Sequence, residues 1–197
     1  MFKIISPEQF RHLLWKNGKG KTVELAVSQG GDVADFDWRI SMASIVENGE
    51  FSDFHQYMRY MVLVEGCDLE LHYLTADKNN SIDYLTHPLD QATFDGSCPT
   101  VGKVKSGAIT NFNLMVKKTK YSADVTTYKQ QTKVTLNQAK FVFAFGIESS
   151  LNCHSITQTV ADFEVPAGHL LQLDNVENNS VTLSGKQMIL LHLYSKG

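Results

Sequence analysis

The pattern of apolar and polar positions along this chain is that of β-strands almost throughout. Residues 59–64 are mostly apolar, Gly66 follows them, and apolar side chains then alternate with polar ones from Leu69 to Tyr73. An apolar run, a glycine turn and an alternating strand are typical of a β-hairpin with a buried face. Gly66 can adopt the positive φ that such a turn often needs. We therefore predict an all-β fold that is arranged around this hairpin.

The second half of the chain repeats this pattern weakly. Residues 141–145 form another apolar run that ends at Gly146, and residues 187–194 form a last apolar strand. A repeated strand–glycine turn–strand pattern indicates two similar units, and closing each set of strands into a barrel removes their exposed edges. We predict two packed β-barrels, formed by residues 1–105 and residues 106–197.

The chain is predicted to form one short helix, at its N-terminus. Ser6 can cap this helix, Pro7 suits the first helical position, and Gln9 can close a capping box. Residues 10–14 would then supply its apolar face, and Gly18 would end it.

The composition is that of an ordinary globular protein of 197 residues, 43% hydrophobic and 20% charged. A net charge of −3 and a pI near 6.1 give no attraction to nucleic acid or anionic membrane. The N-terminus becomes polar too soon for a signal peptide, and no apolar run approaches the roughly 20 residues that span a bilayer. Cys67, Cys98 and Cys153 are expected to be reduced thiols in a cytoplasmic protein.

Five short blocks occur in a fixed order within residues 10–120. They are Trp15-Lys16-Asn17-Gly18-x-Gly20, Phe36-Asp37-Trp38-Arg39-Ile40-Ser41, Gly49-x-Phe51-Ser52, Arg59…Leu63-x-Glu65-Gly66 and Phe112-Asn113-x-Met115. In this order they resemble the HutD/Ves family of bacterial proteins. The resemblance implies a bicupin, that is, two cupin barrels in one chain. It also implies a sensing or regulatory role linked to histidine utilisation or to cold and stress response, with no established catalytic activity.

The chain departs from the family pattern at three places. Lys19 interrupts the family's three glycines, Asn111 stands where an Asp is common, and Lys117-Lys118 stands where paired arginines are common. Lysine lacks the planar fork with which arginine binds a carboxylate. If these groups bind ligand, we expect a ligand that differs from that of the histidine-utilisation branch.

The resemblance also bears on metal binding, because many cupins hold a metal through His-x-His, a following Glu and a later His. These positions fall here on His55, Tyr57, Arg59 and Leu171, while His169 points to the opposite strand face. The charge of Arg59 would repel a divalent cation, and one imidazole does not make a tight site. We expect neither a metal nor another cofactor.

Arginine is rare in this chain, so its positions are informative. Two of the three arginines, Arg39 and Arg59, lie inside β-rich blocks and are predicted to point into the first barrel. Two uncompensated buried cations would be costly, so each needs a partner. The partner is either a small anionic ligand or one of the carboxylates of Asp37, Glu65 and Glu70, and the sequence leaves both alternatives open.

The remaining candidates for ligand binding are Trp15, Lys16 and Asn17 on a loop, His55, and Asn113 on an apolar segment. Trp15 could instead plug the barrel end, Asn17 could make the turn, and Asn113 could hydrogen-bond the backbone.

Three hypotheses of function follow. The first is a metal-free bicupin that binds a small carboxylate metabolite as a sensor or regulator. The second is a cupin isomerase or hydrolase that uses His55 or His72 as acid or base. The third is a protein that acts by surface contact, as a homodimer. We find no Gly-x-Ser-x-Gly, phosphate-binding loop, HExxH or CxxC motif, which favours the first hypothesis over the second.

Overall fold

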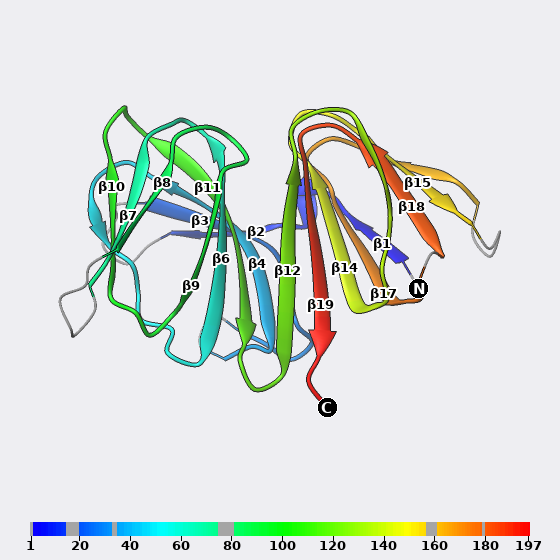
Figure 1. Ribbon diagram of the computed structural model, residues 1–197, viewed down its shortest axis with the longest axis horizontal. Helices are drawn as coiled ribbons and strands as arrows, with labels where there is room; N and C mark the ends of the chain where they lie inside the picture. Colours follow the sequence, from blue (N-terminus) through cyan, green and yellow to red (C-terminus); the bar gives the residue numbers. More distant parts are fainter. Residues whose placement is uncertain (1, 15–19, 33–34, 75–80, 157–160, 179) are drawn as a thin grey trace. The chain divides into compact units, whose positions relative to one another are not determined.

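The computed structural model describes residues 2–14, 20–32, 35–74, 81–156, 161–178 and 180–197 (Figure 1). These residues form strands joined by turns and loops, together with one 3-10 turn, η1 (Pro7–Gln9). The prediction of an all-β protein is therefore confirmed.

The predicted N-terminal helix is wrong beyond its first turn. The Ser6 backbone N–H donates to Gln9 Oε1 (3.0 Å), as a capping box requires, but η1 ends at Gln9. Strand β2 (Arg11–Leu14) follows and pairs with β3 (Gly20–Val27). An isolated helix of this length is marginal, whereas a neighbouring strand satisfies the same backbone groups.

The chain folds into two compact units. Residues 11–120 form the first, called here the N-terminal unit, and residues 1–10 with 121–197 form the C-terminal unit. Strand β11 (Ile109–Lys117) lies beyond position 105, where the sequence suggested a boundary, yet it pairs with strands of the first half. Gly107, with φ of +99°, makes only a turn inside the N-terminal unit.

The N-terminal unit contains two sheets. Its six-stranded sheet has the order β2-β3-β4-β11-β6-β9, with β4 (Trp38–Ile45), β6 (Tyr57–Glu65) and β9 (Gln91–Asp95). Its four-stranded sheet has the order β5-β10-β7-β8, formed by β5 (Gly49–Glu50), β10 (Thr100–Val104), β7 (Leu69–Tyr73) and β8 (Ser81–Leu85). Both sheets contribute to one apolar core, with Met61 and Leu63 from the first and Leu69 and Leu71 from the second. The core therefore lies between the sheets.

The C-terminal unit is built in the same way. One sheet has the order β1-β17-β14-β19-β12, formed by β1 (Phe2–Ile5), β17 (Leu170–Val176), β14 (Ala139–Gly146), β19 (Met188–Ser195) and β12 (Tyr121–Tyr128). The other has the order β13-β18-β15-β16, formed by β13 (Thr132–Thr135), β18 (Val181–Gly185), β15 (Leu151–Ser155) and β16 (Phe163–Val165). Its core is formed by side chains of both sheets.

The predicted hairpin around Gly66 is wrong in one respect. Strand β6 pairs with β11 and β9, whereas β7 pairs with β10 and β8, so the two strands belong to different sheets. Gly66 (φ +84°) and Asp68 (φ +58°) both adopt left-handed conformations and carry the chain from one sheet to the other. An apolar run followed by a glycine indicates a turn, but it does not distinguish a hairpin from a crossing between sheets.

Candidate functional site

The two arginines singled out in the sequence lie in one row across the six-stranded sheet. Met115 on β11 is opposite Arg39 on β4 and also opposite Arg59 on β6. Residues opposite each other point to the same face of a sheet. That face also carries Met61, which belongs to the core. Both arginines therefore point into the interior of the N-terminal unit.

Arg39 has a structural partner, but not one of those proposed from the sequence. Its side chain is only 6% exposed, and its Nε donates to Glu24 Oε2 at 2.6 Å. Glu24, on β3, is itself 3% exposed. Its Oε1 also lies 3.4 Å from Arg11 Nη1. The charge of Arg39 is therefore neutralised within the protein. The sequence missed Glu24 because a carboxylate that alternates with valine and leucine normally faces water.

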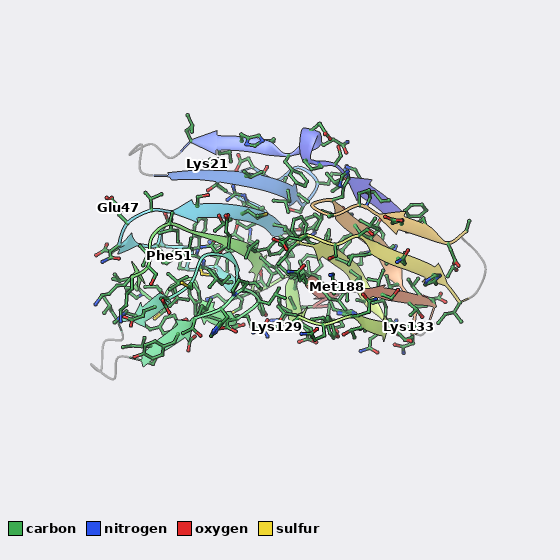
Figure 2. All side chains as sticks on the ribbon, turned by 90° about the horizontal axis from the view of Figure 1, so that it is seen from above. Lys21, Glu47, Phe51, Lys129, Lys133 and Met188 are labelled. Atoms are coloured by element: carbon green, nitrogen blue, oxygen red, sulfur yellow. The ribbon has the colours of Figure 1, made fainter. Side chains whose placement is uncertain are left out.

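Arg59 is equally buried, at 4% exposure, but it has no carboxylate partner among the residues that the structure describes. Its Nη1 donates to the Ser52 carbonyl oxygen at 3.5 Å, and its Nε has no acceptor. The guanidinium carbon lies 5.0 Å from the ring centres of Phe51 and Phe94 and 5.7 Å from that of Phe54; Phe51 is labelled in Figure 2. Burial lowers the pKa of Arg59 to about 10. The side chain is thus a buried cation. Aromatic rings surround it, and no anion among the described residues contacts it.

Asn113 presents a second unpartnered atom to the same interior. It is opposite Ser41 on β4 and Met61 on β6, one row from the arginines on the same sheet face, and is 4% exposed. Its amide Nδ2 donates to Asn111 Oδ1, and Asn111 Nδ2 points to the weak acceptor Met61 Sδ at 3.7 Å. The Asn113 Oδ1 acceptor is left without a donor in the described part of the chain. In the described chain, this oxygen therefore accepts no hydrogen bond from the backbone or from another side chain.

A surface cleft of about 590 Å³ lies next to this interior. Its lining consists of Asp35, Asp53, Phe54, His55, Gln56, Tyr57 and Lys117. Phe54 lines the cleft and also faces Arg59, so it separates the arginine from the cleft. The His55 side chain is 69% exposed and 3.9 Å from Asp53. It lies in the cleft rather than among the buried groups around Arg59.

Each lysine of the basic pair Lys117-Lys118 forms an ion pair with a carboxylate. Lys117 Nζ is 2.8 Å from Asp35 Oδ1, and Lys118 Nζ is 2.8 Å from Asp95 Oδ2. The lysine amine holds the pKa of Asp35 below its usual range through its hydrogen bond. Both lysines therefore hold loops and strand ends of the N-terminal unit together.

His72 does not belong to the interior site. Leu71 and Tyr73, its neighbours on β7, belong to the core, so His72 points to the opposite face of the sheet. There its Nε2 lies 2.8 Å from Glu70 Oε2. Hydrogen bonds from Lys105 and then His72 lower the pKa of Glu70.

Trp15, Lys16 and Asn17 lie outside the described residues, so their predicted part in binding stays a prediction. The positions that carry a metal in other cupins do not supply a donor set here. His55 is exposed, Tyr57 is hydrogen-bonded to Asp35 (3.3 Å), and Arg59 is a cation. Within the described ranges no group of three or more metal-ligating side chains was found.

The interior of the C-terminal unit is different in character. Its core is formed by apolar side chains such as Val142 and Leu190, and the buried polar residues among its described positions are Thr182 and His192. Burial lowers the pKa of His192, while Asp124 on the neighbouring strand acts in the opposite direction. The N-terminal unit, by contrast, buries polar side chains on one face of one sheet: Glu24, Arg39, Ser41, Arg59, Asn111 and Asn113. We therefore locate the candidate site in the N-terminal unit.

Two all-β units, each built of two sheets, give the chain a cupin-like fold. Oxalate decarboxylase from Lactobacillus farciminis superposes with a TM-score of 0.64 at 8% identity, covering 98% of this chain and 86% of that one. The pirin YhhW from Escherichia coli superposes with a TM-score of 0.59 at 7% identity, covering 100% of both chains. At such low identity these likenesses concern the fold alone.

Within this class the chain belongs to the HutD family, whose profile matches residues 7–191. The solved structure of HutD from Pseudomonas fluorescens SBW25, in a formate condition, has a TM-score of 0.80 at 22% identity, with full coverage of both chains. A protein of the hutC 3′ region of Pseudomonas putida is 32% identical over 121 residues, 61% of each chain. Protein Ves of Cronobacter sakazakii is 26% identical over 165 residues, 83% of this chain and 87% of that one.

Several of the matched relatives are covered only in part. The alignments span 61% of the Pseudomonas putida protein, 52% of Ves from Escherichia fergusonii and 56% of Ves from Citrobacter koseri. None of the described helical residues forms a segment long and apolar enough to cross a membrane.

Proposed function

We propose that this HutD-family protein binds a small carboxylate metabolite in its N-terminal unit and acts as a sensor or regulator. The observation that carries the proposal is Arg59, a buried guanidinium that no carboxylate neutralises among the described residues. Native proteins rarely leave a buried charge or polar atom without a partner. A carboxylate is the natural partner of a guanidinium because its two oxygens match the planar fork of donors.

The energetic argument concerns the ligand-free state. A fall in the pKa of Arg59 from 12.5 to about 10 corresponds to roughly 3 kcal/mol of unfavourable interaction with the charged form. The rings of Phe51, Phe54 and Phe94 offset part of this cost, since each cation–π contact contributes about 0.5–2 kcal/mol. A bound anion would remove the remainder. Because the charge of Arg59 lowers the stability of the ligand-free protein, we assign this charge a role in ligand binding.

In this proposal the two units are the two barrels of a metal-free bicupin. The N-terminal barrel binds the ligand, and the apolar interior of the C-terminal barrel gives it a supporting role. The proposal places this regulator in the cytoplasm, in histidine utilisation or in a stress response; the names HutD and hutC 3′ region of its relatives are in line with the first of these two roles. The Pseudomonas fluorescens HutD structure comes from a formate condition, so formate is the first small carboxylate to test.

The test is a thermal-shift panel of monocarboxylates that range in size from formate to benzoate. A ligand at a hundred times its Kd stabilises by about 2.7 kcal/mol, which raises Tm by several degrees in a protein of this size. Arg59→Gln should abolish the shift. Arg11→Gln is the matched control, because Arg11 is an arginine of the same sheet with a side chain that is 54% exposed, and it should retain the shift.

The alternatives give different results. Turnover that is lost in His55→Ala would favour a cupin isomerase or hydrolase that works from the cleft. A concentration-dependent homodimer that no carboxylate stabilises would favour action by surface contact. No shift with any carboxylate, in protein shown to be folded, would refute the proposed binding function.

A further inference from the structure

We infer that the ligand carries a single negative charge and, a few bonds from its carboxylate, an uncharged hydrogen-bond donor. This inference rests on the proposed function, and it is carried by two buried atoms without partners on one sheet face, Arg59 Nε and Asn113 Oδ1.

The charges of the interior select a monoanion. Glu24 already neutralises Arg39, so Arg59 is the one interior cation of the described residues that lacks a carboxylate. Asp83 adds a negative charge at the rim, where it accepts a hydrogen bond from the Tyr73 hydroxyl at 2.8 Å. A dicarboxylate would therefore bury one charge without a partner, which is strongly unfavourable.

The amide chain selects a donor. Asn113 Nδ2 already donates to Asn111 Oδ1, and Asn111 Nδ2 is directed to Met61 Sδ, so the atom of Asn113 that lacks a partner among the described residues is its acceptor oxygen. A buried acceptor that stays unpaired is unfavourable. A hydroxyl, an amide N–H or a neutral ring N–H on the ligand would satisfy it. A charged ammonium would be less favourable than these neutral donors, because Arg59 would repel it.

The register sets the spacing of the two groups. Arg59 is opposite Met115, and Asn113 is opposite Met61, so Arg59 and Asn113 are diagonal neighbours on adjacent strands. Diagonal neighbours lie about 7–8 Å apart. One short ligand can reach both: its carboxylate meets the guanidinium and its donor lies one or two atoms further on. Phe51, Phe94 and Met61 supply apolar and aromatic surface around the two groups.

The experiment compares matched ligands by calorimetric titration of the wild-type protein. Two pairs isolate the donor: glycolate against acetate, and 3-hydroxypropionate against propionate. Methoxyacetate keeps the oxygen of the glycolate substituent but replaces its O–H by a methyl ether, and malonate adds a second charge. We expect one hydroxy acid to bind at least fivefold more tightly than its unsubstituted partner, and malonate to bind at least fivefold more weakly than glycolate.

Asn113→Leu, similar in size and without the acceptor, tests the assignment of the donor site. The preference for the hydroxy acid should fall to within twofold, while the affinity for acetate or propionate stays within threefold of wild type. The wild-type series decides the question even if this variant does not fold. The inference is overturned if both pairs bind within twofold of each other, if methoxyacetate binds as well as glycolate, or if malonate binds most tightly. Binding of no carboxylate at all would instead refute the proposed function.

Discussion

At the scale of single residues, Arg39 and Arg59 show how the same side chain can have opposite effects on stability. They lie in one row of one sheet and are buried to a similar degree. Of the two, Arg39 pairs with Glu24, and Arg59 does not. Removing one partner of a buried ion pair leaves the other charge unpaired, whereas removing a lone buried charge relieves a cost.

This difference predicts opposite outcomes for the same substitution. Arg39→Met should lower the free energy of unfolding by up to about 3–5 kcal/mol, because it leaves the buried Glu24 with only the partly exposed Arg11 as a partner. Arg59→Met should raise the free energy of unfolding of the ligand-free protein by about 1–3 kcal/mol, because no anion loses its partner. Urea unfolding without added carboxylate measures both.

The double variant Glu24→Gln/Arg39→Met is the control for the first result. It should recover much of the stability that Arg39→Met loses, since the Glu24 carboxylate that lost its Arg39 partner is replaced by a neutral amide. A loss of stability in Arg59→Met as large as in Arg39→Met would mean that Arg59 has an internal anionic partner, and the argument for a ligand would then lose its basis.

At the scale of elements, the turn at Gly66 directs the chain from one sheet to the other. Its φ is +84°, and a Cβ there would lie 2.8 Å from the Ala108 carbonyl oxygen and 2.8 Å from Ile109 Cγ2. Gly107, at φ +99° in the loop before β11, has no atom within 4 Å of the same position. Both glycines adopt the left-handed conformation, but one alone is also packed closely.

Gly66→Ala and Gly107→Ala therefore form a matched pair. Each should lose about 1–2 kcal/mol because alanine is strained at positive φ. Gly66→Ala should lose about 1–3 kcal/mol more, because its methyl group meets backbone and a β-branched side chain. Chemical denaturation gives the two values. Equal losses would show that close packing at Gly66 does not contribute to the crossing between the sheets.

At the scale of the whole molecule, the order of elements along the chain is not the order of the units. Strand β1 pairs with β17, far along the sequence, and Phe2 stacks on Phe163 at a centroid distance of 4.3 Å. The N-terminal residues thus complete the C-terminal unit. β1 also covers what would otherwise be an exposed edge of β17.

Removing residues 1–5 should therefore destabilise the unit that is distant in sequence. Hydrogen exchange, read out by peptide, should show faster exchange in β17 and in the neighbouring β14, because they lose a paired edge and the packing of Ile4. Protection in β4, β6 and β11 should stay unchanged, since these strands belong to the other unit. Faster exchange confined to β4, β6 and β11 would contradict this organisation.

Part of the fold and of the site could be predicted from local sequence. The apolar run at residues 59–64 and the β-rich block around Arg39 indicated that both arginines lie inside, and the glycine at position 66 marked a real turn. The helix after Pro7 failed because a strand partner, β3, competes for the same backbone groups. The hairpin failed because strand pairing is decided by contacts distant in sequence.

The sequence by itself determined that the chain is a β protein of a recognisable family, because alternation and short motifs are local properties of neighbouring residues. Only the tertiary structure decided which carboxylate meets which arginine: Glu24 reaches Arg39 across the pairing of β3 with β4, and nothing comparable reaches Arg59 in the described chain. It also decided that, among the described residues, Asn113 Nδ2 donates to Asn111 Oδ1 while Asn113 Oδ1 has no donor. The physical reason is that a buried charge or hydrogen bond depends on which strands are adjacent, and that adjacency is set by the packing of the whole sheet.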